Sequence, residues 1–97
     1  RVCIVGASYG GYAALAGVTL QQGLYRCAVA VAPVSDIADM FREDVRASGQ
    51  LNTTRASLLS QLGAKERWNA VSPLRAADKA SAPIMLIHGV DDTVVPY

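Results

Sequence analysis

The chain has 97 residues, of which 52% are apolar and 18% charged, and its formal net charge at neutral pH is +1. These values are ordinary for a globular protein, and so small a net charge gives no argument for binding nucleic acid or an anionic membrane. No apolar run approaches the roughly 20 residues that span a bilayer, and no secretory signal pattern opens the chain. One histidine and two cysteines offer no metal-ligand spacing, so we expect no metal ion and no cofactor.

The first thirty residues predict a strand–helix–strand unit. Residues 1–7 are almost continuously apolar, which is typical of a strand in a parallel sheet covered on both faces. A helix rich in Ala and Gly is predicted over Gly10–Gln22, with Gly23 as its stop, and a second buried strand over Cys27–Ala32. The pattern therefore indicates an α/β fold.

The two cysteines each lie near the start of a predicted strand. A buried free cysteine behaves as a small apolar residue, and two cysteines are too few for a disulfide-based scaffold. We therefore predict that Cys3 and Cys27 are reduced core residues. A bridge between neighbouring strands is the alternative.

The junction between the first strand and the helix carries the pattern Gly6-Ala7-Ser8-Tyr9-Gly10. A serine on a tight turn from strand to helix, flanked by glycines at two residues on either side, is typical of a nucleophile elbow. Gly6 and Gly10 would let neighbouring backbone pass close to the turn. The helix N-terminus, with the backbone N–H of Tyr9, would face the anion that forms during acyl transfer. We predict that Ser8 is a nucleophile.

Two phosphate-binding motifs fit this glycine-rich turn less well. A dinucleotide fingerprint requires Gly-x-Gly-x-x-Gly, and Ser8 occupies the position of its second glycine. A phosphate-binding P-loop requires Lys and then Ser or Thr after the last glycine, where Tyr12-Ala13 stand. A purely structural turn is the remaining alternative.

The middle of the chain is predicted to be a surface excursion between strands. Charged residues follow Ser35, and a short amphipathic helix is expected near Arg55–Leu62. A further helical piece runs from Ser72-Pro73 through Lys79, and Pro83–His88 is a third buried strand followed by the loop Gly89–Asp92.

Acidic residues follow the second and third strands, where functional groups of α/β sheets collect. Asp91 and Asp92 follow the third strand, and either is a candidate to orient an imidazole next to Ser8 or merely a turn residue. Asp36 is predicted to be a helix N-cap. His88, the only histidine, precedes the acids and ends an apolar strand, so we predict that it holds the loop and is not the general base.

Two sequence blocks resemble the prolyl oligopeptidase family of serine peptidases. The first is Gly6-Ala7-Ser8-Tyr9-Gly10-Gly11-Tyr12, and the second is Ser72-Pro73 followed by the tract Pro83–Pro96, with His-Gly-x-x-Asp at its centre. The resemblance implies a partial α/β-hydrolase catalytic domain over residues 1–97, three-layered with central parallel strands. It also implies that Ser8 is the nucleophile and Asp92 the triad acid, with a catalytic histidine beyond Tyr97.

The resemblance sets the expected activity and its limits. Many members of the family carry Arg two residues after the acid, where Val94 stands here, so the specificity of the type enzyme does not transfer. We expect a peptidase that cleaves short peptides, with an esterase or small-amide hydrolase as the alternative. Because no general base is expected within 1–97, the chain alone is expected to be almost inactive.

Overall fold

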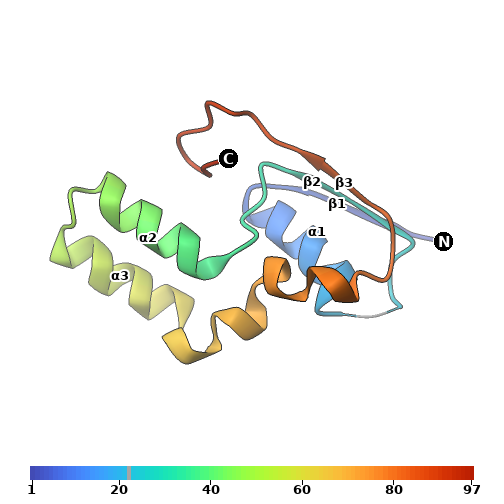
Figure 1. Ribbon diagram of the computed structural model, residues 1–97, viewed down its shortest axis with the longest axis horizontal. Helices are drawn as coiled ribbons and strands as arrows, with labels where there is room; N and C mark the ends of the chain where they lie inside the picture. The colour runs from blue at the N-terminus through green and yellow to red at the C-terminus, as the bar shows by residue number, and fades with distance from the viewer. Residues whose placement is uncertain (22) are drawn as a thin grey trace.

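The chain forms three parallel strands connected by helices (Figure 1). The computed structural model describes residues 1–21 and 23–97. The elements in chain order are β1 (Cys3–Ala7), α1 (Tyr9–Thr19), β2 (Cys27–Val31), α2 (Ile37–Ala47), α3 (Asn52–Leu62), the 3₁₀ turns η1 (Lys65–Arg67), η2 (Asn69–Val71) and η3 (Pro73–Lys79), and β3 (Ile84–Ile87). The sheet order is β1-β2-β3, with all pairs parallel. The predicted α/β class is confirmed.

The elements next to the predicted elbow lie close to their expected positions. All three strands form within the predicted ranges, each slightly shorter than expected. Helix α1 ends at Thr19, because the N–H groups of Leu20 and Gln21 both donate to the Ala16 carbonyl and close the last turn. The predicted end of this helix at Gln22 lies outside the described residues.

Helix α1 packs on one face of the sheet. Its buried residues Ala14 and Leu15 form an apolar cluster with Ala30 of β2, and Ile4 and Ile84 from the flanking strands pack against that cluster. Burial of these apolar side chains packs α1 against the sheet. The position of the first turn of α1 therefore depends on the packing of the whole helix.

The opposite face of the sheet is open among the described residues. Val5, Met85 and Ile87 point to this face and are 68%, 59% and 45% exposed. The helices of residues 1–21 and 23–97 lie on the other side (Figure 1). Of the three expected layers, these residues form the sheet and one layer of helices.

The excursion after β2 builds a second core. Val34, Ile37, Phe41, Val45 and Trp68 are buried together there. In α2 the apolar residues recur every four positions, which turns one side of the helix towards Trp68. The sequence predicts a helix start at Asp36 but no bounds for α2, because the intervening charged residues obscure that spacing.

The prediction of reduced core cysteines is wrong. Cys3 and Cys27 form a disulfide, with a Cα–Cα distance of 4.6 Å. They are directly opposite each other on the neighbouring parallel strands β1 and β2, so their side chains emerge on the same open face. Cys3 is exposed and Cys27 half-buried. The alternative of a bridge between neighbouring strands is the correct one.

Candidate active site

Ser8 adopts the strained backbone conformation that a nucleophile elbow requires. Its φ is 54° and its ψ is −119°, a region that non-glycine residues rarely enter. Two backbone hydrogen bonds hold it there: the Ser8 N–H donates to the Val31 carbonyl at 2.9 Å, and the Ser8 carbonyl accepts from the Tyr12 N–H at 3.1 Å. The Ser8 side chain makes no capping hydrogen bond to α1. The Ser8 side chain thus takes no part in holding its own turn.

The glycines around Ser8 differ in why they are needed. A Cβ built on Gly6 would lie 2.0 Å from the Gly10 carbonyl oxygen, so only glycine fits at position 6. A Cβ at Gly10 would meet nothing within 4 Å of the described atoms, so the space around position 10 does not require glycine, although the Gly10 carbonyl closely approaches Gly6. A Cβ at Gly11 would lie 2.9 Å from the Pro33 side chain. This need for glycine at position 11 was not predicted, although the Gly-Gly pair was an available signal.

Helix α1 begins directly after Ser8. Its first residue is Tyr9, and the N–H groups of a first helical turn have no partner within the helix. The first turn has no acidic residue that would compete for these donors. The Tyr9 side chain is 77% exposed. This arrangement leaves the backbone N–H of Tyr9 available to a developing anion next to Ser8.

Asp92 shapes the loop that carries it. Its Oδ1 accepts hydrogen bonds from the Val94 N–H and the Val95 N–H, both at 2.9 Å. Those two bonds, with a smaller attraction from His88, lower the pKa of the Asp92 carboxyl below its ordinary value. Its second oxygen, Oδ2, lies 3.8 Å from the His88 Nε2. The ionised carboxylate is therefore built into the loop, with one oxygen left outside the two backbone bonds.

His88 holds the same loop from the other side. Its Nε2 lies 2.7 Å from the Val95 carbonyl oxygen, and its ring meets the Tyr97 ring edge-on with centroids 5.7 Å apart. The side chain is 14% exposed. These contacts agree with the interpretation of His88 as a loop-holding residue.

Ser8 and Asp92 lie at the same edge of the sheet. Both follow the carboxyl ends of parallel strands, β1 and β3, and β2 runs between these strands. Strands in a sheet are about 4.8 Å apart, so the two chain segments are separated by about 10 Å at this edge. Two residues placed in this way do not need direct contact if a third side chain bridges them.

Asp36 has the capping role that was predicted for it. Its Oδ1 accepts from the backbone N–H groups of Ala38 and Asp39 at the start of α2. Its buried Oδ2 lies 3.1 Å from the Arg75 Nε but accepts no hydrogen bond, so that contact is ionic only. Asp36 therefore anchors the start of α2.

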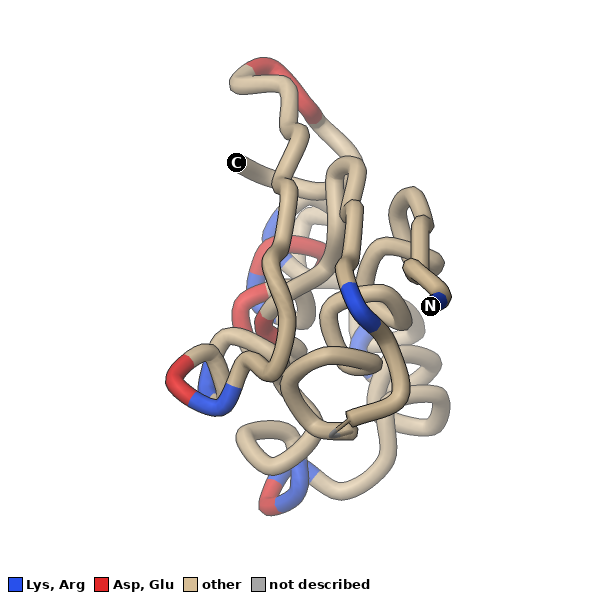
Figure 2. Tube along the Cα trace, turned by 90° about the vertical axis from the view of Figure 1, so that its right-hand side faces the viewer, with Lys and Arg blue, Asp and Glu red and all other residues tan. Residues whose placement is uncertain are grey.

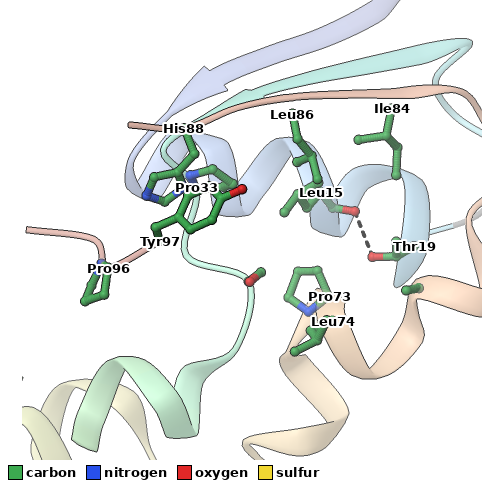
Figure 3. A pocket seen from close by; sticks show the side chains of 12 residues that line it. Leu15, Thr19, Pro33, Pro73, Leu74, Ile84, Leu86, His88, Pro96 and Tyr97 are labelled. Carbon is green, nitrogen blue, oxygen red and sulfur yellow. Dashed lines mark hydrogen bonds between the residues drawn. The ribbon is translucent and has the colours of Figure 1, made fainter. Parts of the chain in front are cut away.

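A cavity of about 550 Å³ lies beneath β3, between α1 and η3 (Figure 3). Its walls are mainly apolar, with Leu15, Ile84 and Leu86 on one side, and His88 and Tyr97 at one end. Ser8 does not line this cavity, so we do not assign the cavity to the candidate active site.

Neither sign of charge dominates the chain, whose formal net charge is +1. Acidic and basic residues are interspersed along the chain (Figure 2). Within residues 1–21 and 23–97, no three His, Cys, Asp or Glu side chains are placed to hold a metal ion. No helix in the same part of the chain is long and apolar enough to cross a bilayer. The absence of a cofactor and of nucleic-acid or membrane partners remains a prediction.

A strand, a strained serine and a helix, with an acid at the same edge of a parallel sheet, define the α/β-hydrolase class. The sequence matches the prolyl oligopeptidase family over residues 1–97, and the chain belongs to that family. The "Dipeptidyl peptidase family member 6" of Caenorhabditis elegans is 28% identical over 102 residues, which cover 95% of this chain and 13% of the relative.

Solved structures give the same result. A Mycobacterium tuberculosis puromycin-hydrolyzing peptidase superposes with a TM-score of 0.81 at 28% identity, over 99% of this chain and 14% of that one. An acylaminoacyl peptidase in complex with Z-Gly-Gly-Phe-chloromethyl ketone superposes with a TM-score of 0.75 at 26% identity, over 99% of this chain and 15% of that one. The chain thus spans about one seventh of the length of these relatives.

Proposed function

We propose that residues 1–97 form part of the catalytic domain of a serine peptidase that cleaves short peptides through an acyl-enzyme on Ser8. The observation that carries this proposal is the strained conformation of Ser8 at the N-terminus of α1, with its side chain not used as a cap. A purely structural turn has no need to hold a serine at φ 54°, because glycine adopts that region without strain.

In the proposed reaction, the Ser8 Oγ attacks the carbonyl carbon of the scissile bond and gives its proton to a histidine outside residues 1–97. The carbonyl oxygen becomes an anion and accepts a hydrogen bond from the Tyr9 N–H. The C–N bond then breaks and the histidine returns the proton to the leaving amine. Water attacks the acyl-enzyme in the same way and releases Ser8.

Asp92 has a defined part in this scheme. Its Oδ2 would accept a hydrogen bond from the histidine, hold that ring in the required tautomer and stabilise its protonated form. The separation of about 10 Å between the strands of Ser8 and Asp92 leaves room for one bridging imidazole. Because His88 is bound to the loop through Val95, it is not in the position that this bridge needs.

Peptide substrates are supported by the relatives. The structure of one similar acylaminoacyl peptidase contains a peptide chloromethyl ketone, and another similar protein is a puromycin-hydrolyzing peptidase. The second relative also favours an alternative, hydrolysis of small amides. Fold and triad do not fix the acyl group, so an esterase activity belongs to the same alternative.

The test is labelling of the full-length protein with a fluorophosphonate probe, next to a Ser8→Ala variant. We expect labelling that is lost in the variant, because the probe reacts only with an activated serine. Rates on short peptides, a puromycin-type amide and a p-nitrophenyl ester then rank the substrate classes. Equal labelling of both proteins, or none, would show that the turn is structural only.

A further inference from the structure

The first turn of α1 is weak by its own composition. Gly10 and Gly11 follow each other there, and glycine is among the least favourable residues inside a helix. The N-cap residue Ser8 provides no side-chain hydrogen bond, and no acidic side chain stabilises the positive end of the helix. The donor proposed to stabilise the oxyanion, the Tyr9 N–H, lies in this turn. Contacts from outside the first turn of α1 are therefore needed to fix the position of the Tyr9 N–H.

Tyr12 is the first residue after the two glycines, and it reaches outside the helix. Its hydroxyl donates a hydrogen bond to the Val71 carbonyl oxygen at 2.7 Å, across 59 positions of sequence. Its ring stacks on the Tyr9 ring, with centroids 5.7 Å apart and planes inclined by 25°. One half-buried side chain therefore contacts both the exposed residue of the turn and a separate segment.

The segment that accepts this hydrogen bond is itself well anchored. The residue after Val71 is Ser72, which is fully buried. The Ser72 hydroxyl donates to the Trp68 carbonyl at 2.6 Å and accepts from the Ile37 N–H at 2.9 Å. Trp68 is 5% exposed. The Val71 carbonyl is thus a fixed point of the second core.

We propose that Tyr12 is a positioning residue for the oxyanion donor, holding the first turn of α1 against the second core through its hydroxyl and steadying Tyr9 through its ring. This inference rests on the proposed function. Tyr12 touches neither substrate nor reacting atoms in this assignment. It acts through Tyr9, whose N–H has to be in place before charge develops.

The hydroxyl is suited to this role. Burial, with a smaller contribution from Tyr9, raises the pKa of Tyr12 above its ordinary value. The phenol therefore stays protonated and able to donate throughout the neutral range.

The experiment compares Tyr12→Phe with wild type in the full-length protein, with Tyr25→Phe as the matched control. The Tyr25 ring lies against Gly17, nearer the other end of α1. We expect the rate constant for fluorophosphonate labelling of Tyr12→Phe to fall about tenfold, because a misplaced donor weakens only the transition state. For the same reason kcat and kcat/KM should fall together with KM unchanged. Tyr25→Phe should label at the wild-type rate.

A second variant separates positioning from folding. Replacement of Tyr12 by para-aminophenylalanine keeps a ring and an N–H donor, and we expect it to restore most of the lost rate. If Tyr12→Phe lowers the melting temperature but labels at the wild-type rate, or if the amino variant restores nothing, the positioning role is overturned and the proposed function stands. If wild type itself is not labelled, both are overturned.

Discussion

The two halves of the candidate site are held in opposite ways. At the elbow, the Ser8 side chain takes no part in its own turn, which is formed by main-chain hydrogen bonds and the close approach of Gly6 to Gly10. At the acid loop, the Asp92 carboxylate itself accepts the two N–H groups that shape the loop. Ser8 can therefore be altered without altering the scaffold around it, whereas a substitution that removes the acceptor oxygen of Asp92 also removes the hydrogen bonds that shape its loop.

This difference predicts that a substitution at Ser8 changes activity without changing stability. At Asp92, a substitution that removes the acceptor oxygen should change both. A nucleophile needs a hydroxyl that is not engaged in other hydrogen bonds. At Ser8 the strain lies in the backbone angles, and the side chain makes no capping hydrogen bond. An orienting acid needs a fixed carboxylate, and hydrogen bonds from the loop both fix it and keep it ionised. Substitutions at the elbow and at Asp92 test this difference.

The largest effect is expected at Asp92, from a comparison of Asp92→Asn with Asp92→Ala. The amide oxygen of Asn still accepts from Val94 and Val95, but its charge is gone, so we expect peptidase activity to fall about 10,000-fold with the loop intact. Alanine removes the charge and both hydrogen bonds, so it should also lower the melting temperature. Steady-state kinetics and thermal unfolding of the full-length protein measure the two effects. Equal melting temperatures for Asn and Ala would show that the carboxylate does not shape the loop.

At the elbow, the expected effect of Gly6→Ala is structural. The added Cβ would meet the Gly10 carbonyl oxygen at 2.0 Å, and backbone on both sides would have to move. We expect a loss of roughly 4 kcal/mol or more in the free energy of unfolding, together with loss of probe labelling. Urea unfolding with a labelling assay measures both.

Gly10→Ala is the matched control for that experiment. The added Cβ has open space within the described structure, and alanine favours a helix by about 1 kcal/mol over glycine. We expect Gly10→Ala to be at least as stable as wild type. A loss of stability equal to that of Gly6→Ala would contradict the steric account of the elbow.

The same contrast shows which features the sequence could predict. The strand, Ser8 and the start of α1 are contiguous, so a short pattern specifies them, and the structure has Ser8 in the expected turn. Asp36 as an N-cap is equally local. In contrast, the choice between Asp91 and Asp92 needed the family resemblance, because both follow the strand and either suits a turn.

Features that depend on packing between distant segments were not predictable. The Tyr12 contact with Val71 spans 59 positions, and the sequence around either residue contains no pattern that predicts it. The disulfide depends on strand register, because Cys3 and Cys27 become partners only when β1 and β2 pair without an offset. The need for glycine at position 11 likewise depends on where Pro33 lies after β2.

Reduction of the Cys3–Cys27 disulfide is expected to have an intermediate effect, confined to stability. The bridge closes a sequence separation of 24 residues, for which loop-closure entropy corresponds to about 3 kcal/mol. It joins the starts of β1 and β2, at the other end of the strand from Ser8. We expect a Cys3→Ser/Cys27→Ser double variant to unfold at lower urea and to label at the wild-type rate when folded. A slower labelling rate would show that the disulfide also affects the geometry of the turn at Ser8.

The smallest effect is expected from the pH dependence of the acid loop. The pKa of Asp92 is lowered in the folded state, so its contribution to stability is complete above the ordinary aspartate pKa of about 4 and is lost as the pH falls through the lowered value. NMR titration of the Val94 and Val95 amide resonances should therefore show a midpoint below about 4; a midpoint at or above that value would refute the lowered pKa. The bonds from Val95 and Val94 are the main causes and His88 a lesser one, so His88→Gln should raise this midpoint only slightly. A large shift in that variant would mean that the histidine, and not the backbone, keeps Asp92 ionised.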